Sequence, residues 1–448
     1  MTGPGESQAS EMQGVSRSQA AHGAAARYDA VIVGASLAGC TAATLLGREG
    51  LRVALVEKSP DPEAYKRICS HFIQSSAVET LERLGVVQEL EQMGARRSRT
   101  RIWTRWGWIM PPANPSVPAS LNMRRERLDP FLRRLAAQTP GVELILGATA
   151  EDLVRESDGT VIGVIVRGRS GERTTLSAPL TVGADGRDSS IGELSQVTTR
   201  RLPHGRFAYG AYYEGPEPAG SPDGSLWVLD PQMAAAFPTD EGLTMYVCMP
   251  THDRLPEFKR DLPRALESFV SEIPDAPPIL ASRRVGPVQG RIDMTNVVRS
   301  PTAPGLSLIG DAALALDPLW GIGCGFALQT AEWLTDGVAP ALKGERPLTD
   351  GLQAYRRRYA AGLHEHTTTI VGFATGRRLN PGERLVFSAA TGDERMQELM
   401  EAFGTRNARP RAFLGRAVPR ALVVHAQQRV RSRGATSRSS QQASEAAL

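Results

Sequence analysis

The chain has 448 residues, of which 41% are apolar and 22% charged, with a formal net charge of +4. This length predicts about two domains, and the basic residues are interleaved with acidic ones, which argues against nucleic-acid binding. No apolar run of about 18 residues predicts a membrane span. The first 26 residues lack the apolar segment of a secretory signal, so a cytoplasmic protein is expected.

Alternating strand and helix patterns predict an α/β fold. A β-rich run at Tyr28–Val33 leads through a glycine turn into a helix at Leu37–Gly50 and then a strand at Val53–Glu57. Repeated β-type segments between 206 and 300 predict a second sheet, and 350–425 is mostly helical in pattern. The four cysteines have no CxxC spacing, so neither a disulfide framework nor a zinc site is indicated.

The segment YDAVIVGASLAGCTAATLLGREGLRVALVEK, residues 28–58, has the strand, turn, helix and strand order of a dinucleotide-binding unit. Gly34 permits the tight turn and Gly39 the close helix–strand approach, while Ser36 stands where glycine is commonest. Backbone N–H groups at the helix start favour a pyrophosphate. Glu57 ends the second strand, 18 residues after Gly39, where a carboxylate accepts hydrogen bonds from ribose hydroxyls.

Two later motifs separate FAD from NAD. LTVGADGRDSSI, residues 180–191, places Asp185-Gly186 after a strand, and LSLIGDAALALDPLWGIGCGFAL, residues 306–328, places Gly310-Asp311 after another. With three motifs in this order, the chain resembles the para-hydroxybenzoate hydroxylase superfamily of FAD-dependent monooxygenases over roughly 27–340. The resemblance implies an α/β fold: a Rossmann-like FAD-binding domain, an inserted β-sheet substrate domain and a helical C-terminal region.

The resemblance also implies boundaries and roles. Glu57 would hold the adenosine ribose, and Asp311 the ribityl chain. Asp185 and Gly186 would mark a loop near the pyrophosphate. The implied organisation is a disordered tail at 1–26, a discontinuous FAD-binding domain at 27–71, 126–200 and 290–345, a substrate domain at 72–125 and 201–289, a helical region at 346–431 and a disordered tail at 432–448.

Further positions match the family near the flavin. Arg125 corresponds to a contact of the ribityl chain or phosphate, and Arg67 to an arginine near the flavin. Pro318 and the helix start after it match the flavin-cradling loop, whose N–H groups stabilise negative charge on the reduced ring. The predicted cofactor-binding residues are Gly34, Ser36, Leu37, Ala38, Gly39, Glu57, Lys58, Arg67, Arg125, Asp185, Gly186, Gly310, Asp311, Pro318, Gly321, Ile322 and Gly323.

The implied activity is a monooxygenase. NADH or NADPH would reduce FAD, O2 would add at C4a of the flavin, and the resulting hydroperoxide would hydroxylate or epoxidise a small molecule. A separate flavin reductase is an open alternative as the source of electrons, and the oligomeric state is also open. The arginine-rich composition suits secondary metabolism such as antibiotic biosynthesis. An aromatic or apolar substrate is suggested by Tyr209, Tyr212, Tyr213, Trp227 and Trp320, although core packing explains most of them equally well.

Two departures leave the reaction open. Leu314 stands where many aromatic hydroxylases have histidine, and Asp317-Pro318 replaces their Pro-Pro. The Asp-Pro pair is more similar to the halogenase and geranylgeranyl reductase branches. Trp106-Gly-Trp108-Ile-Met-Pro111 resembles a halogenase motif, but in halogenases that motif follows the Asp-Gly motif, whereas here it precedes Asp185. Halogenases also need an active-site lysine early in the substrate region, and no lysine occurs between Lys66 and Lys259. We therefore expect these aromatics to line a wall of the substrate domain. A halogenase, a geranylgeranyl reductase-like enzyme and a non-catalytic flavin-binding protein are the alternatives.

No nucleophilic triad is visible, so the catalytic residues are not identified. His71, near Cys69 and the expected flavin edge, is an outside candidate for handling a proton. His364 and His366 would point about 200° apart on a helix, so no metal site is expected and both are interpreted as surface histidines.

Overall fold

The computed structural model describes residues 26–112, 117–318 and 321–445, with side chains up to residue 430. Residues 1–25, which form nearly all of the N-terminal tail expected to be disordered, lie outside the described residues, as does Trp320.

A six-stranded sheet forms the centre of one half of the molecule, in the order β21-β22-β13-β2-β3-β9. All of these strands are parallel to their neighbours except β21. The second and third strands of the chain are continuous apolar runs whose side chains are buried on both faces, as a covered parallel sheet requires. The members are β2 (Ala30–Val33), β3 (Val53–Glu57), β9 (Val142–Leu146), β13 (Leu180–Gly183), β21 (Thr302–Ala303) and β22 (Leu306–Leu308).

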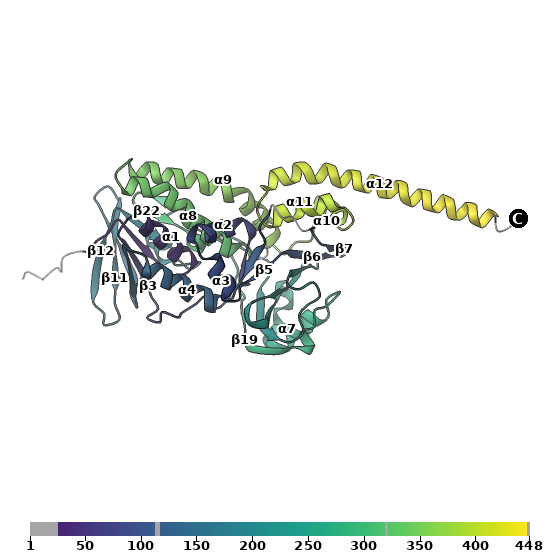
Figure 1. Ribbon diagram of the computed structural model, residues 1–448, viewed down its shortest axis with the longest axis horizontal. Helices are drawn as coiled ribbons and strands as arrows, with labels where there is room; N and C mark the ends of the chain where they lie inside the picture. The colour runs from purple at the N-terminus through teal and green to yellow at the C-terminus, as the bar shows by residue number, and fades with distance from the viewer. Residues whose placement is uncertain (1–25, 113–116, 319–320, 446–448) are drawn as a thin grey trace, which may run out of the picture.

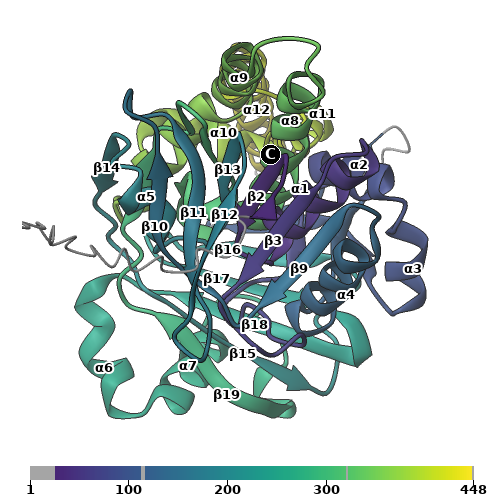
Figure 2. The same ribbon diagram turned by 90° about the vertical axis from the view of Figure 1, so that its left-hand side faces the viewer.

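Helices and a β-meander complete this half (Figures 1 and 2). The first helix packs on the long helix at 322–342, which in turn packs on the helix that follows it. The meander, β10-β11-β12, is extended by β1, which pairs with β12 in parallel, and this sheet shares one apolar core with the parallel sheet and these helices. Its strands and the helices are β1 (Ala26–Arg27), β10 (Thr149–Arg155), β11 (Val161–Arg167), β12 (Arg173–Ser177), α1 (Leu37–Arg48), α2 (Ser75–Leu84), α3 (Val87–Gln92), α4 (Arg125–Gln138), α5 (Ser190–Leu194), α8 (Ile322–Leu342) and α9 (Leu348–Ala374).

A seven-stranded sheet forms the second half, in the order β19-β15-β18-β17-β16-β6-β7. Side chains alternate between its faces: Trp227 packs against the helices at 255–271, whereas its neighbours Leu226 and Val228 pack toward the C-terminal helices. The elements are β6 (Thr100–Thr104), β7 (Gly107–Ile109), β15 (Ala208–Glu214), β16 (Gly224–Val228), β17 (Met233–Pro238), β18 (Leu243–Met249), β19 (Arg283–Arg291), α6 (Leu255–Arg260), α7 (Leu262–Ser271), α10 (Pro381–Ala390) and α11 (Glu394–Gly404).

Two small sheets connect the halves, in the orders β14-β20-β23 and β4-β8-β5. Their strands are β4 (Phe72–Ile73), β5 (Arg96–Ser98), β8 (Ser120–Asn122), β14 (Thr199–Leu202), β20 (Asn296–Arg299) and β23 (Leu314–Ala315). The predicted α/β class, with a parallel sheet, further sheets and C-terminal helices, is confirmed. The predicted domain boundaries remain a prediction, although every strand of the six-stranded sheet comes from segments assigned to the nucleotide domain.

The last helix, α12 (Pro410–Glu445), packs with its first part on α10 and α11, and its C-terminal part projects away from the rest of the molecule (Figure 1). It runs through 432–445, where disorder was expected. No proline follows Pro419, so nothing in the sequence blocks extension of a helix already nucleated, although serines and a glycine make this stretch a weak helix former by itself. Within the described residues no helix combines the length and apolar character needed to cross a bilayer.

Candidate functional site

The carboxyl ends of β2, β13 and β22 bring the three predicted motifs to one edge of the parallel sheet. At the first motif, Gly34 has φ +108, and a Cβ there would lie 2.5 Å from the carbonyl oxygen of Ala184. A Cβ on Gly39 would lie 1.8 Å from the carbonyl oxygen of Gly34. Only glycine fits at either position, so the turn and the start of α1 press closely together, as the fingerprint predicts.

The start of α1 has the features of an anion site. Its N-cap residue, Ser36, makes no side-chain cap, and its first turn has no acidic residue. Leu37 and Ala38 are buried behind the turn. Uncapped N–H groups at a helix start, with the positive end of the helix dipole, suit a pyrophosphate.

Glu57 lies beside this turn at the end of β3. Its carboxylate accepts hydrogen bonds from the N–H groups of Ala35 and Ser59, both at 2.9 Å. It is therefore fixed where the sequence predicts a ribose contact, while the neighbouring Lys58 is exposed. These residues fit the adenosine end of a dinucleotide.

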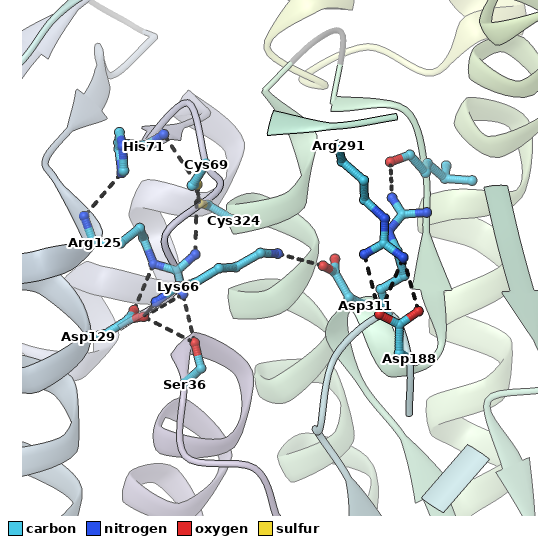
Figure 3. A network of polar contacts seen from close by, with 12 residues as sticks. Ser36, Lys66, Cys69, His71, Arg125, Asp129, Asp188, Arg291, Asp311 and Cys324 are labelled. Carbon is cyan, nitrogen blue, oxygen red and sulfur yellow. Dashed lines mark hydrogen bonds and ion pairs between the residues drawn. The ribbon is translucent and has the colours of Figure 1, made fainter. Parts of the chain in front are cut away.

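Ser36 has a role that the sequence alone did not reveal. Its hydroxyl accepts a hydrogen bond from the Arg125 guanidinium at 2.7 Å, and Arg125 is also paired with Asp129 at 2.7 Å (Figure 3). Ser36 immediately precedes α1, and Arg125 and Asp129 lie in the first two turns of α4. Burial opposes the charge on Arg125, but Asp129, together with Cys69 and Cys324, outweighs burial and holds the pKa of Arg125 well above its usual range. Ser36 therefore stabilises the buried Arg125–Asp129 ion pair. A glycine at this position would remove one hydrogen-bond partner of Arg125.

The second motif lies against the first, but its carboxylate is engaged locally. Asp185 accepts hydrogen bonds from the hydroxyls of Ser189 and Ser190 and from the N–H of Ile191 at the start of α5. Gly186, with φ +86, has open space around its Cβ position. A contact from this loop to a pyrophosphate would thus come from the backbone, and the predicted role of Asp185 stays a prediction.

At the third motif, Asp311 forms an ion pair with Lys66, Oδ2 to Nζ, at 2.7 Å (Figure 3). Burial alone would raise the pKa of Asp311, but the Lys66 ammonium, together with Arg187 and Arg125, outweighs burial and lowers the pKa. Gly310 has φ +56, and a Cβ there would lie 3.0 Å from the Cβ of Ala38 on α1. A charged carboxylate is therefore held between α1 and α8, as a ribityl contact requires.

The loop after Asp311 ends in a helix start suited to a ring system. Gly321 has φ +64, caps α8 without a side-chain bond, and donates its N–H to the Pro318 carbonyl at 2.8 Å. A Cβ on Gly321 would lie 2.7 Å from the Phe72 ring. Ile322 is buried and Gly323 has only the Asp311 carboxylate within 4 Å of its Cβ position.

Asp317 anchors this loop, a role that the sequence did not suggest. Its side chain is fully buried and meets His204 at 2.7 Å and Arg206 at 3.2 Å. Arg206 also donates to the carbonyl of Phe373 at the end of α9. The departure from Pro-Pro at 317–318 therefore ties the loop to the second sheet and to the C-terminal helices.

The segment between β3 and β4 brings His71 into the site with a strained backbone, φ +62. The Nδ1 of His71 accepts the Arg125 N–H at 3.0 Å, and its Nε2 meets the Tyr212 hydroxyl on the second sheet. Burial lowers the pKa of His71. The ring is thus neutral with its hydrogen on Nε2. Arg67, on the same segment, is exposed, and its predicted contact with the flavin stays a prediction.

A small apolar cavity, partly open to solvent, lies between the seven-stranded sheet and α11. Its walls come from four separate stretches of the chain, a combination that sequence patterns did not indicate. Phe72 forms one wall and also lies against Gly321, so the cavity adjoins the start of α8. The lining residues are Phe72, Thr100, Ile102, Ile109, Pro111, Leu226, Phe237, Met400, Glu401, Gly404 and Thr405.

A smaller cavity adjoins the first through Gly404 and is lined by a half-buried cation, Arg406. The Arg406 guanidinium donates to the side-chain oxygens of Gln74 and Gln329. Burial lowers the pKa of Arg406 to about 9. His366, expected at the surface, lines this cavity and stacks on Phe403. The helical geometry predicted for the histidine pair holds, because His364 is exposed on the opposite side of α9.

The tryptophan motif at 106–111 divides between the two faces of the second sheet. Trp108 packs edge-on against Trp227 and donates to Asp275 at 2.9 Å, away from the cavity. Ile109 and Pro111 line the cavity instead. No lysine is among the described residues of the cavity wall, and no group of three metal-ligating side chains occurs in the described part of the chain.

Comparisons with known proteins agree with this geometry. A family model described as an FAD binding domain matches residues 27–365. A tryptophan 2-halogenase from Chondromyces crocatus is 26% identical, over 77% of this chain and 67% of its own. A menaquinone reductase from Mycolicibacterium smegmatis is 27% identical, over 79% and 84%. A squalene epoxidase from Schizosaccharomyces pombe is 25% identical, over 70% and 69%.

Solved structures share the fold. A probable FAD-dependent monooxygenase from Pseudomonas aeruginosa has a TM-score of 0.66 at 20% identity, covering 85% of this chain and 100% of its own. A myxobacterial FAD-dependent halogenase has a TM-score of 0.68 at 18% identity, covering 87% and 99%. These matches confirm the predicted fold and family resemblance. The named relatives are enzymes, as was predicted for this chain.

Proposed function

This chain belongs to the FAD binding domain family, and from that premise we propose that it is an FAD-dependent monooxygenase acting on an apolar small molecule. The apolar cavity carries the proposal, because Phe72 forms its wall and also packs against Gly321 at the start of α8. A substrate seated there lies next to the place that the loop after Asp311 offers to the flavin. When bound, FAD supplies the redox chemistry and the reaction with oxygen.

The protein's own part is to bind, orient and exclude water. The α1 start takes the pyrophosphate, Glu57 the ribose and Asp311 the ribityl chain. N–H groups at the start of α8 stabilise negative charge on the ring. The apolar walls keep water from the reacting atoms, which protects a reactive oxygen species from premature loss.

His71 and Tyr212 have a positioning role in this proposal. Because His71 presents its Nε2 hydrogen to the Tyr212 oxygen, the Tyr212 hydroxyl hydrogen stays available for another acceptor. Burial raises the pKa of Tyr212, so this proton is retained at neutral pH. Tyr212 packs against the same apolar cluster as the cavity walls, where it can donate to a polar group of the substrate.

The first test is the purified protein with FAD. We expect bound flavin absorbance, NADH- or NADPH-dependent oxygen uptake, and stimulation by an apolar probe such as indole, 1-naphthol or squalene with formation of an oxygenated product. A colourless protein that fails to take up added FAD contradicts the cofactor. If only a separate flavin reductase restores turnover, electrons come from that partner. A role in secondary metabolism stays a prediction.

Two relatives define the competing outcomes. Turnover of an alkene without oxygen would identify a reductase, the reaction class named for the menaquinone relative. A brominated product, formed with bromide and added flavin reductase, would identify a halogenase. Either result would overturn the monooxygenase proposal while leaving FAD binding intact.

The cavity itself is tested by filling it. Met400→Trp places a larger side chain into the cavity from α11, and we expect the KM for the apolar probe to rise at least tenfold with FAD still bound. Met110→Trp is the control, because Met110 is 55% exposed between two wall residues. Equal kinetics for both variants would place the substrate elsewhere.

A further inference from the structure

Two cysteines that are 255 residues apart meet beside the site. The sulfur atoms of Cys69 and Cys324 are 3.6 Å apart (Figure 3). Cys69 lies on the segment between β3 and β4, and Cys324 lies in the first turn of α8. No step proposed above uses either thiol.

The surroundings divide the pair into a thiolate and a thiol. The Cys324 thiol, as hydrogen-bond donor, is the main cause that lowers the pKa of Cys69, and it outweighs burial. The N–H of His71 points at the Cys69 sulfur at 3.2 Å, and the Arg125 guanidinium lies 3.7 Å from it. The hydrogen bond to Cys69, together with burial, raises the pKa of Cys324. An activated thiolate therefore faces a neutral thiol within reach.

The other two cysteines provide the contrast. Cys40 on α1 and Cys248 on β18 are buried, and desolvation raises the pKa of each. Thiols held in this state are inert, whereas a thiolate beside cations is nucleophilic. Access also differs, because Cys69 is only partly buried and its neighbour Ile68 is 46% exposed.

We propose that Cys69 and Cys324 are a redox-active dithiol that a hydroperoxide oxidises to an intramolecular disulfide. The Cys69 thiolate attacks one oxygen of H2O2, which breaks the O–O bond and gives a sulfenic acid and hydroxide. The Cys324 sulfur then attacks the Cys69 sulfur. The S–O bond breaks, and the sulfenic hydroxyl leaves as water with the thiol proton. In sum, two thiols and H2O2 give one disulfide and two waters.

The disulfide would join two parts of the site that now only touch. The sulfurs must approach by about 1.6 Å to reach bonding distance. A small backbone movement around Cys69, in the segment at 66–71, can supply this. That segment also carries Lys66 and His71, so its contacts with Asp311 and Tyr212 would become fixed relative to α8. The inference does not depend on which reaction the flavin performs, because any peroxide source suffices.

Peptide mapping of the FAD-loaded protein tests it directly. Trypsin places Cys69 in the peptide 68–83 and Cys324 in the peptide 300–343, with one cysteine in each. After equimolar H2O2 and blocking with iodoacetamide, we expect a linked pair about 2 Da lighter than the two thiol peptides together. Dithiothreitol should release both peptides. Cys40 and Cys248 should be recovered in the same digest as unlinked, carbamidomethylated cysteines.

Single variants separate the two steps. In Cys324→Ser we expect Cys69 to be trapped by dimedone as a sulfenic acid without a linked peptide. In Cys69→Ser, Cys324 should remain a thiol, and Cys248→Ala should still form the link. The proposal is overturned if Cys69 in the wild type reacts with iodoacetamide no faster than Cys248. It is also overturned if peroxide carries Cys69 to a sulfinic acid while Cys324 stays free.

Discussion

The two ends of the site are built in different ways. At the α1 end, Gly34, Gly39 and Glu57 come from one stretch of about thirty residues, and each position follows from the local turn. At the α8 end, the cavity and the Cys69–Cys324 contact join segments hundreds of residues apart. The difference teaches that cofactor binding here is a local property of the sequence, whereas the surroundings of the reacting ring depend on the whole fold.

Arg125 links the two ends, so replacing it should have the largest effect. Arg125→Met leaves Asp129 buried without its guanidinium, and we expect the free energy of unfolding to fall by about 3–5 kcal/mol. Urea denaturation measures this loss. Arg134→Met is the matched control on the same helix. Arg134 is 53% exposed in its pair with Glu63, and a change within about 0.5 kcal/mol is expected. If both variants lost a similar free energy of unfolding, the Arg125–Asp129 pair would not be what joins the α1 and α8 ends of the site.

At the α1 end, Gly39→Ala forces a Cβ against the Gly34 carbonyl. We expect about 3 kcal/mol of lost stability from overpacking and a loss of FAD affinity of at least tenfold, measured by flavin fluorescence titration. Gly372→Ala is the control, because Gly372 is also helical but has open space at its Cβ position. It should be neutral or slightly stabilising. Retention of full FAD affinity in Gly39→Ala would contradict the close helix–strand approach.

At the α8 end, His366 should make stability depend on pH. Burial first, and Arg406 second, lower its pKa to about 4. As pH falls below about 6.5, His366 is protonated in the unfolded chain but stays neutral in the folded chain. This difference lowers the free energy of unfolding by about 2 kcal/mol at pH 5. His366→Phe should lose less stability between pH 7 and pH 5 than the wild type does. His364→Phe, with the exposed neighbour replaced, should lose as much as the wild type, and the reverse ranking would refute the burial argument.

The smallest effect is expected at the tryptophan motif. Trp108→Phe removes the hydrogen bond to Asp275 on the face away from the cavity, at a cost of about 1 kcal/mol. Kinetics with the apolar probe should be unchanged, in contrast to Met400→Trp. A clear change in KM would mean that the motif acts on the substrate after all.

The fingerprint end was predictable because its constraints are steric and local. The turn at Gly34, the approach at Gly39 and the carboxylate ending β3 follow from residue type and spacing alone. The other end was not predictable for the opposite reason. Gln74 reaches Arg406 across 332 positions, and nothing in either neighbourhood marks the partner. His366 was misread as a surface residue because the helix pattern says which residues share a face, but not which face is covered.

The uncapped starts of α1 and α8 have a consequence for the chain without its cofactor. Their N–H groups have no acidic side chain in either first turn to satisfy them, so FAD bound as proposed would complete both helices. A ligand that binds only the folded state stabilises it by mass action, by about 2.7 kcal/mol at a hundredfold excess over Kd. We therefore expect the cellular abundance of this protein to follow the flavin supply. Riboflavin starvation should shorten its lifetime before it limits any reaction.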